Sequence, residues 1–295
     1  MVRSVVLPRA NPWTNLAREE ALFQALGAEG VMMVLYVNRG CVVMGKHQNP
    51  LREVRFEALR KNKVPVLRRF SGGGTVYHDE GNLNYSFLAP KEEFNKALFL
   101  EFVEQTVSHF GQPLTLTTAG DLLLGAAKVS GTASQIHRER SMVHGTLLCC
   151  ADLVGLHGLL GPTGELEKFI GVASRPSLVA NLGLGVDDVV EALVAGFHQR
   201  WGGQPQAWAS LSTGAIGEQA VTLEAVLRSR DWTWDRTPAF TWVGETLRGK
   251  LKVKVEDGLI REASSHSPGD ETQNLSRMVG KSFFSSEFFD LGEFL

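Results

Sequence analysis

The sequence predicts an α+β protein built from mixed, largely antiparallel strands with helices packed against them. Short runs of β-branched and aromatic residues, such as 31–39, recur between turn residues and are typical of strands. Segments with helical spacing of apolar residues, such as 92–111, stand between groups of strands and do not follow each strand in turn. A doubly wound parallel sheet would need a regular strand–helix alternation, so this order favours the α+β class.

The N-terminal segment is consistent with two interpretations. Its apolar residues 5–7 are typical of a short strand, and Asn15 or Thr14 would cap a helix that begins near Leu16. The same stretch contains arginines and no acidic residue before Glu19, which is also typical of a mitochondrial transit peptide. The strand-and-helix interpretation is favoured, and targeting stays open on these residues alone.

Strands and one amphipathic helix lead up to a glycine triplet. Two strands are predicted between residues 31 and 44 because of their β-branched content. Pro50 opens an amphipathic helix with a basic end, since proline is tolerated in a first helical turn. A further strand over 64–70 then runs directly into Gly72–Gly74.

The middle of the chain is expected to contain a hairpin, a helix and several strands. Residues 74–88 are predicted to form a hairpin that turns at Asp79–Gly81. The helix over 92–111 ends at Gly111 because glycine favours helix termini. Three strands are expected between 114 and 153, and two helical pieces between 176 and 202.

The composition changes near residue 202 and predicts two domains. Residues 202–220 are small and polar and are expected to form a linker. Residues 1–205 would then be the catalytic domain, and residues 221–295 a small α+β accessory domain with one helix and three alternating strands.

Charge and cysteine content narrow the classes of function. The net charge of -2 argues against broad electrostatic capture of nucleic acid or membrane surfaces. No apolar run approaches the roughly 20 residues that a membrane span needs. The three cysteines show no framework spacing and no closely spaced histidine partners, which predicts a reducing compartment and no metal site.

The glycine triplet Gly72–Gly74 is the first candidate binding feature. Glycines between a strand with Arg69 and a strand from Thr75 allow positive φ values and let a ligand approach backbone N–H groups. The pattern matches neither a Walker P-loop nor a dinucleotide fingerprint. From the residues alone, an anion site and a simple turn remain equal alternatives. His78 and Asp79 are more typical of a turn than of a catalytic pair.

Three further stretches of the sequence contain candidate functional residues. Lys128 lies in an apolar run inside a predicted strand, so its ammonium must either reach solvent or serve an anion. His144 alone is expected to be structural, although Thr146 follows it with a hydroxyl. Cys149 and Cys150 have no base beside them in sequence, which favours a buried apolar role over a nucleophilic one.

Three of these stretches, in this order, resemble a known family. RRFSGGGTVYHDEGNLNYSF (68–87), KVSGTAS (128–134) and HGTLL (144–148) resemble the lipoate–protein ligases and lipoyltransferases. The likeness covers about residues 1–200, and WTWDRTPAF (232–240) is similar to the start of the family's small C-terminal domain. The implied fold is the catalytic fold that this family shares with biotin protein ligases.

The resemblance implies a lipoyl-adenylate site. Lys128 would be the catalytic residue, binding the phosphate and the acyl carbonyl oxygen. The residues implied in substrate and adenylate binding are Arg69, Gly73, Gly74, Thr75, Val76, Tyr77, Asn82, Lys128, Thr146 and Ser177. No permanently bound cofactor is expected: lipoyl-AMP would be the substrate, with ATP and Mg needed only by a complete ligase. Composition alone suggests Val34, Val43 and Met44 as the slot for the acyl chain.

One departure from the family pattern bears on the reaction. Ligases that activate free lipoate carry an Asn-Asp pair ahead of the lysine strand, and here Asp121 is kept while Gly120 replaces the asparagine. The stretch RPSLVANL (175–182) also resembles the animal mitochondrial lipoyltransferases. Transfer from an already activated or carried acyl group is therefore favoured over a complete ATP-dependent ligase. A non-catalytic protein that binds lipoyl-AMP or lipoyl domains is the alternative from another class.

The resemblance also implies partners and a compartment. The acceptors would be apo lipoyl domains of 2-oxoacid dehydrogenase E2 subunits and the glycine cleavage H protein. A monomer without nucleic-acid or membrane partners is expected. The mitochondrion is the expected location, and the cytoplasm would replace it if the source is bacterial.

Overall fold

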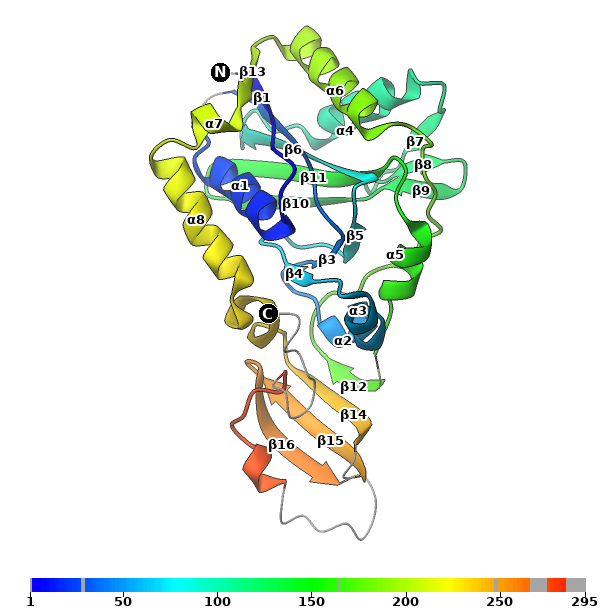
Figure 1. The fold of residues 1–295 in the computed structure, drawn as a ribbon, viewed down its shortest axis with the longest axis vertical. Coiled ribbons are helices and arrows are strands. Elements are labelled where there is room, and N and C mark those ends of the chain that lie inside the picture. The colour runs from blue at the N-terminus through cyan, green and yellow to red at the C-terminus, as the bar shows by residue number, and fades with distance from the viewer. Residues whose placement is uncertain (1, 28–29, 164, 247–248, 266–274, 285–295) are drawn as a thin grey trace.

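The computed structural model describes residues 2–27, 30–163, 165–246, 249–265 and 275–284, and it confirms the α+β class. A six-stranded sheet forms the centre of the molecule, and a four-stranded sheet lies at one end (Figure 1). Two further sheets have three strands each. No helix in the described part of the chain is long and apolar enough to cross a bilayer.

The central sheet is mixed, with strand order β10-β11-β6-β2-β1-β13. Strand β1 is parallel to both of its neighbours, and the other pairs are antiparallel. The strands are β1 (Arg3–Val6), β2 (Met32–Val37), β6 (Asn82–Pro90), β10 (Thr132–His137), β11 (Arg140–Leu148) and β13 (Gln204–Ala207).

Helices cover both faces of this sheet, so its inner strands are apolar on both sides. In β2, Met33 and Leu35 pack into one core while Met32 and Val34 pack into the other, as the twofold alternation of a strand requires. The covering helices are α4 (Lys96–Ser108) and α6 (Val186–Trp201) on one face, and α1 (Pro12–Gln24) and α8 (Ala215–Arg228) on the other. Every residue of β2 and β6 is consequently buried.

Two small sheets and three short helices flank the central sheet. One small sheet has the order β4-β3-β5 and the other β7-β8-β9. Their bounds are β3 (Cys41–Met44), β4 (Val66–Arg68), β5 (Val76–His78), β7 (Leu114–Leu116), β8 (Leu122–Leu124) and β9 (Ala127–Ser130). The short helices are α2 (Pro50–Glu53), α3 (Phe56–Asn62) and α5 (Leu153–Leu159).

The C-terminal sheet shares a hydrophobic core with the rest of the chain. Its order is β12-β14-β15-β16, and β12 comes from the part of the sequence before α6. Trp234 and Phe240 pack in one cluster with Val42 of β3 and Leu51 of α2. The remaining elements are α7 (Trp208–Leu211), a π-helical turn (Asp231–Asp235), β12 (Glu165–Phe169), β14 (Phe240–Thr246), β15 (Gly249–Glu256), β16 (Leu259–Ser265) and a 3-10 turn (Ser276–Met278).

The N-terminal stretch forms β1 and α1, but the helix begins earlier than predicted. Its cap is Asn11, whose side chain accepts a hydrogen bond from the Thr14 N–H at 2.9 Å, and Pro12 occupies the first turn. An Asn–Pro start satisfies a free N–H group and presets φ, which explains the earlier start.

The predicted hairpin over 74–88 is wrong, although the turn at Asp79–Gly81 is present. Strand β5 pairs with β3, whereas β6 pairs with β2 and β11, so the turn carries the chain from one sheet to another. Asp79 fixes this turn because its carboxylate accepts from the N–H groups of Gly81 and Asp152. A contact between residues 79 and 152 cannot be predicted from the local sequence pattern.

The segment predicted as a linker is mostly regular structure. Residues 204–207 form edge strand β13, and residues 208–211 and 215–228 form α7 and α8. Small and polar residues suit an edge strand and a surface helix start as well as they suit a linker, which explains the misprediction. Two predicted helical stretches also differ: Val54 is extended and pairs with Leu160, dividing α2 from α3, and no helix precedes α6 after residue 176.

Candidate functional site

The three motif stretches of the sequence converge at one end of β11. The glycine triplet joins β4 to β5, and a Cβ on Gly73 would lie 3.0 Å from the Cβ of Ala133 on β10. His144 on β11 reaches Ser71 in front of the triplet, with 2.7 Å between Nε2 and Oγ. The Thr146 N–H donates to the carbonyl of Gly131 at 3.1 Å.

The glycine triplet presents backbone donors that are free of other groups in the described part of the chain. The N–H groups of Gly72, Gly73 and Gly74 have no acceptor among the described residues, and all three glycines are at least partly exposed. Gly73 has a φ of +87°, which a side chain would strain. Free N–H groups on such a turn are suited to an anionic ligand.

The backbone after the triplet is already engaged. The Thr75 N–H donates to the Ser174 hydroxyl at 2.8 Å, and residues from Val76 onward pair with β3. Ser174 is held in turn by the buried carboxylate of Glu53, which accepts from its N–H and its hydroxyl. The adenylate roles expected of Thr75 and Val76 therefore stay predictions, and the free donors lie one to three residues earlier.

Arg69 provides a fixed positive charge beneath this loop. It is buried, and its guanidinium donates to Ser71 Oγ at 2.9 Å, to the Val43 carbonyl at 3.3 Å and to the Gly72 carbonyl. Burial lowers the pKa of Arg69 to about 10, with Glu19 acting in the opposite direction. The group stays charged at neutral pH and carries its charge next to the glycine N–H groups.

A chain of polar side chains connects the loop to helix α1. His144 contacts Ser71 through Nε2 and the Glu19 carboxylate through Nδ1, the latter at 3.2 Å. Glu19 also accepts from Tyr36 and Ser86. Burial by itself would raise the pKa of Glu19, but His144 and the hydroxyl donors lower it below its ordinary value.

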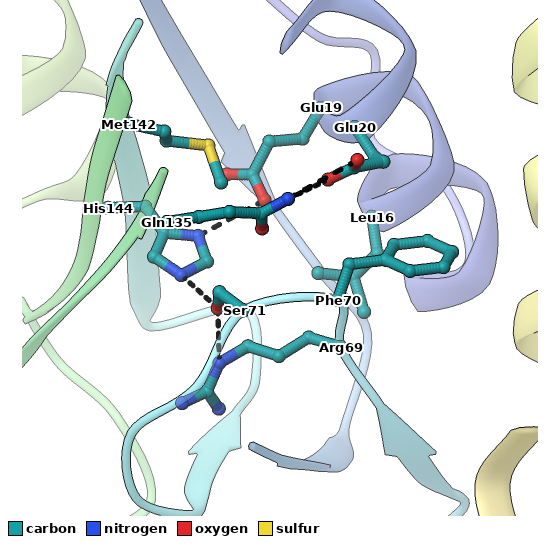
Figure 2. Close-up of a pocket in the computed structure, with 9 residues that line it drawn as sticks. All are labelled: Leu16, Glu19, Glu20, Arg69, Phe70, Ser71, Gln135, Met142 and His144. Carbon is teal, nitrogen blue, oxygen red and sulfur yellow. Dashed lines mark hydrogen bonds and ion pairs between the residues drawn. The ribbon is translucent and has the colours of Figure 1, made fainter. Parts of the chain in front are cut away.

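A small pocket lies along this chain, with Arg69 and Ser71 at one end and Glu20 and Gln135 at the other (Figure 2). In Figure 2 the Gln135 amide points at the Glu20 carboxylate. Its Nε2 donates to Glu20 Oε2 at 3.3 Å. Burial raises the pKa of Glu20 to about 7. The lining residues are Leu16, Glu19, Glu20, Arg69, Phe70, Ser71, Gln135, Met142 and His144.

The slot expected around Val34, Val43 and Met44 stays a prediction. All three side chains are fully buried in the packed core and line no part of this pocket. Their apolar character reflects sheet packing, while the pocket walls come from α1, β10, β11 and the end of β4.

Lys128 stands on β9, in the small side sheet instead of the predicted central strand. Its Nζ lies 2.8 Å from the Asp121 carboxylate, and its side chain is 27% exposed. Its N–H donates to the Leu178 carbonyl at 2.8 Å, and its carbonyl accepts from the Ala180 N–H at 3.1 Å. A Cβ on Gly131 would lie 2.8 Å from Lys128 Cε, so glycine leaves room for the lysine to pass.

The other sequence-predicted residues differ in their accessibility. Thr146 is partly exposed on β11, and Ser177 is exposed beside the segment that brackets Lys128. Tyr77 is buried, and Asn82 is completely buried with its amide nitrogen on Asn84. Their binding roles stay predictions.

Several residues of the site carry no local signal in the sequence. Glu19 lies on an ordinary amphipathic helix, and Ser174 lies in a loop a hundred residues from the triplet that it contacts. The adjacent acidic residues Glu19 and Glu20 on an amphipathic helix were the one feature of the sequence that could have indicated a polar site there. Cys149 is buried as expected, and Cys150 is exposed, contrary to expectation.

This arrangement suits chemistry on an acyl phosphate. Free N–H donors next to a buried guanidinium can hold a phosphate, and the partly exposed ammonium of Lys128 can contact an anionic substrate. A cation placed between an acyl carbonyl and a phosphate leaving group stabilises the charge that develops on both.

Comparison with known proteins agrees with this geometry. The model of the lipoyl protein ligase A/B catalytic domain matches residues 11–198, which is more than half of the chain. The chain belongs to this family. As a member of it, the protein carries the catalytic domain of enzymes that attach lipoyl groups to proteins.

Solved structures of lipoate ligases share the fold. P. falciparum LipL1, in complex with lipoate, aligns at a TM-score of 0.70 with 22% identity over 90% of this chain and 84% of its own. A lipoate-protein ligase A bound with ATP aligns at a TM-score of 0.63 with 22% identity, over 76% of this chain and 95% of its own. The bi-partite lipoate protein ligase of Thermoplasma acidophilum is described with its E2 lipoyl domain. It aligns at a TM-score of 0.65 with 21% identity, over 79% of this chain and 96% of its own.

Proposed function

We propose that this protein is a lipoyltransferase. It moves a lipoyl or octanoyl group onto a specific lysine of lipoyl domains, in amide linkage, from lipoyl-AMP or from an acylated carrier. The observation that supports this most is that the three motif stretches touch: Gly73 lies against Ala133, the Thr146 N–H donates to Gly131, and Lys128 lies on the strand that leads to Gly131. Family membership supplies the lipoyl class of substrate.

In this proposal Lys128 is the catalytic residue. Its ammonium would contact the acyl carbonyl oxygen and the phosphate of lipoyl-AMP, replacing Asp121 as one of its partners. The acceptor lysine attacks the carbonyl carbon as a neutral amine, the bond from that carbon to the phosphate oxygen breaks, AMP leaves with the bonding electron pair, and the amine nitrogen loses one proton to solvent. The glycine N–H groups and Arg69 stabilise that departing charge.

Transfer is favoured over a complete ATP-dependent ligase because of Gly120. Its φ is +94°, and a Cβ there would lie 2.9 Å from Thr132 Oγ1 and 3.0 Å from Leu100 Cδ1. A side chain at this position would have to displace these neighbours, and glycine offers no polar group in place of the asparagine that lipoate-activating members carry. The remaining acid, Asp121, is already paired with Lys128. Both features support transfer over a complete ligase.

The proposed acceptors are apo lipoyl domains of 2-oxoacid dehydrogenase E2 subunits and the glycine cleavage H protein. A relative of the same fold is described with an E2 lipoyl domain, which supports this class of partner. We propose a mitochondrial location for the same reaction, because 2-oxoacid dehydrogenases are the proposed targets.

The test is a comparison of acyl donors on an apo lipoyl domain, followed by intact-protein mass spectrometry. Lipoyl-AMP or an acylated carrier protein should modify the domain, and lipoate with Mg-ATP should not. Modification from lipoate and Mg-ATP at a similar rate would show a complete ligase. No modification from any donor would indicate a binding protein without this activity.

A further inference from the structure

Arg68 is completely buried, yet it pairs with no acidic group among the described residues. Its guanidinium donates instead to uncharged oxygens on both sides of it. Burial lowers its pKa to about 10, so the group remains charged at neutral pH. A buried, unpaired cation costs free energy, and it persists only where its hydrogen bonds hold surrounding structure in place.

One side of Arg68 faces the loop 45–48. Nη1 donates to the carbonyls of Gly45, Lys46 and Gln48, at 3.3, 3.1 and 2.7 Å. Three carbonyls that point at one nitrogen wrap this loop around the guanidinium. The shape of the loop 45–48 therefore depends on Arg68.

The loop 45–48 lies directly against the glycine triplet. The Lys46 N–H donates to the Ser71 carbonyl at 2.8 Å, and the Gln48 side chain accepts from the Thr75 hydroxyl at 2.8 Å. A Cβ on Gly45 would lie only 2.1 Å from the Gly73 carbonyl oxygen. A shift in this loop is therefore passed to the backbone that presents the free N–H donors.

The other side of Arg68 faces the C-terminal segment. Nε donates to the Thr233 carbonyl at 3.0 Å, and Nη2 donates to the Thr237 hydroxyl at 3.1 Å. The Trp232 indole N–H donates back to the Arg68 carbonyl at 2.7 Å. The Trp232 ring packs on Phe70 with 4.7 Å between centroids, and Phe70 lines the pocket.

We propose that Arg68 is a positioning residue through which the C-terminal segment shapes the substrate site. Trp232, Thr233 and Thr237 support the pocket wall at Phe70 and, through Arg68, the loop that sets the glycine triplet. The C-terminal part of the chain is then needed for binding of the acyl donor. This inference deepens the proposed transferase function and rests on it.

The test compares Arg68→Lys with wild type. Lysine keeps the charge but cannot reach both sides, so the KM for lipoyl-AMP should rise about tenfold while kcat changes less than about threefold. Trp232→Phe keeps the ring contact but loses the indole N–H, and it should raise KM by a smaller factor. Arg261→Lys makes the same exchange at an exposed arginine of β16 and should leave KM unchanged.

Hydrogen–deuterium exchange of the unliganded protein gives a readout that does not depend on transfer. Arg68→Lys should speed exchange in peptides covering 45–48 and 70–75, with exchange of β2 and β6 unchanged. If the folded variant shows wild-type exchange in those peptides, or loses kcat with KM unchanged, the inference is overturned. A wild-type protein that transfers from no donor would instead remove the proposed function, and the exchange result would still decide the role of Arg68.

Discussion

At the scale of single residues, two neighbouring arginines have different tasks. Arg69 holds the glycine loop and lines the pocket, whereas Arg68 points the other way and binds carbonyls of two separated segments. Alternation along a strand puts adjacent side chains on opposite faces, so a basic pair at the end of β4 necessarily serves two environments. Sequence alone identified Arg69 through resemblance and gave no separate role to Arg68.

Gly131 is predicted to control Lys128 without affecting the fold. A methyl group there would overlap the lysine side chain at 2.8 Å from Cε, and a flexible side chain can move aside. Gly131→Ala should therefore lower the rate of transfer from lipoyl-AMP about tenfold or more, while the free energy of unfolding changes by less than about 1 kcal/mol. Gly158→Ala, where a Cβ meets nothing within 4 Å, is the matched control in α5. An unchanged rate in Gly131→Ala would contradict the role of Lys128.

The residues of the site divide into those with local signals and those without. Lys128 and the glycine triplet are recognisable because charge in an apolar strand and three consecutive glycines are unusual in any context. Glu19, Ser71 and His144 form one polar chain only because α1, the loop and β11 meet in space. That meeting depends on sheet order, which local pattern does not determine.

At the scale of elements, the glycine loop works because strands on both sides hold it. Strand β4 leads into it, β5 leads out of it, and both pair with β3 in one small sheet. The anchored ends leave the triplet between them free to present its N–H groups. The sheet thus fixes where the loop begins and ends, and glycine at position 73 permits the positive φ between those ends.

Within this loop, Gly73 and Gly72 should respond differently to the same substitution. Gly73 has positive φ, and a Cβ there would lie 2.9 Å from the Arg69 guanidinium, so Gly73→Ala should destabilise the fold by about 1–3 kcal/mol and weaken donor binding. A Cβ on Gly72 meets nothing within 4 Å, so Gly72→Ala should leave the free energy of unfolding within about 0.5 kcal/mol of wild type. Urea denaturation of both variants checks this. Equal stabilities would count against the strained turn.

Strand and helix positions were largely predictable, and pairing was not. The strand β2, the helix α4 and three of the four strands of the C-terminal sheet (β14, β15 and β16) follow from periodicity. The hairpin failed because the Asp79 carboxylate also binds the N–H of residue 152, and the linker failed because β13 adds to the edge beside β1. Both errors come from contacts between segments far apart in the chain.

At the scale of the whole molecule, the C-terminal sheet is joined to the rest by packing and by polar contacts. The cluster around Trp234 and Phe240 continues into β3 and α2, and Arg68 crosses the same boundary. This shared core was not predictable, because its members come from parts of the chain that are far apart in the sequence.

The contribution of His78 to the stability of the molecule should fall as the solution becomes acidic. Burial lowers the pKa of His78 to about 3, with Arg69 and His144 adding to the effect, and its Nδ1 accepts from the Asn38 amide. Below the ordinary histidine pKa of about 6.5 the unfolded chain binds a proton that the folded protein does not. The contribution of His78 is therefore complete above that pH and decreases as pH falls toward 3, by about 1.4 kcal/mol per pH unit, whereas Glu20, whose pKa is raised to about 7, contributes with the opposite sign as pH falls below 7.

Urea denaturation between pH 6.5 and pH 5 measures this slope. The variant His78→Gln removes this titrating group but keeps Glu20, so the difference in free energy of unfolding between the two proteins should change by about 1.4 kcal/mol per pH unit across this range, whatever the variant's absolute stability. The chosen range lies above the region in which Glu19, whose pKa is lowered, would add a loss of the same sign. Parallel slopes for the two proteins would contradict a neutral, buried His78.

The central claim is that Lys128 and the glycine loop transfer a preformed acyl group to a lipoyl domain. Its most direct test is one turnover with lipoyl-AMP, an apo lipoyl domain and no ATP, read by intact mass and by mapping the modified lysine. We predict one lipoyl group on one lysine of the domain with the wild-type protein, and none with a folded Lys128→Ala variant. Absence of transfer by the wild type, or equal transfer by Lys128→Ala, would contradict the account.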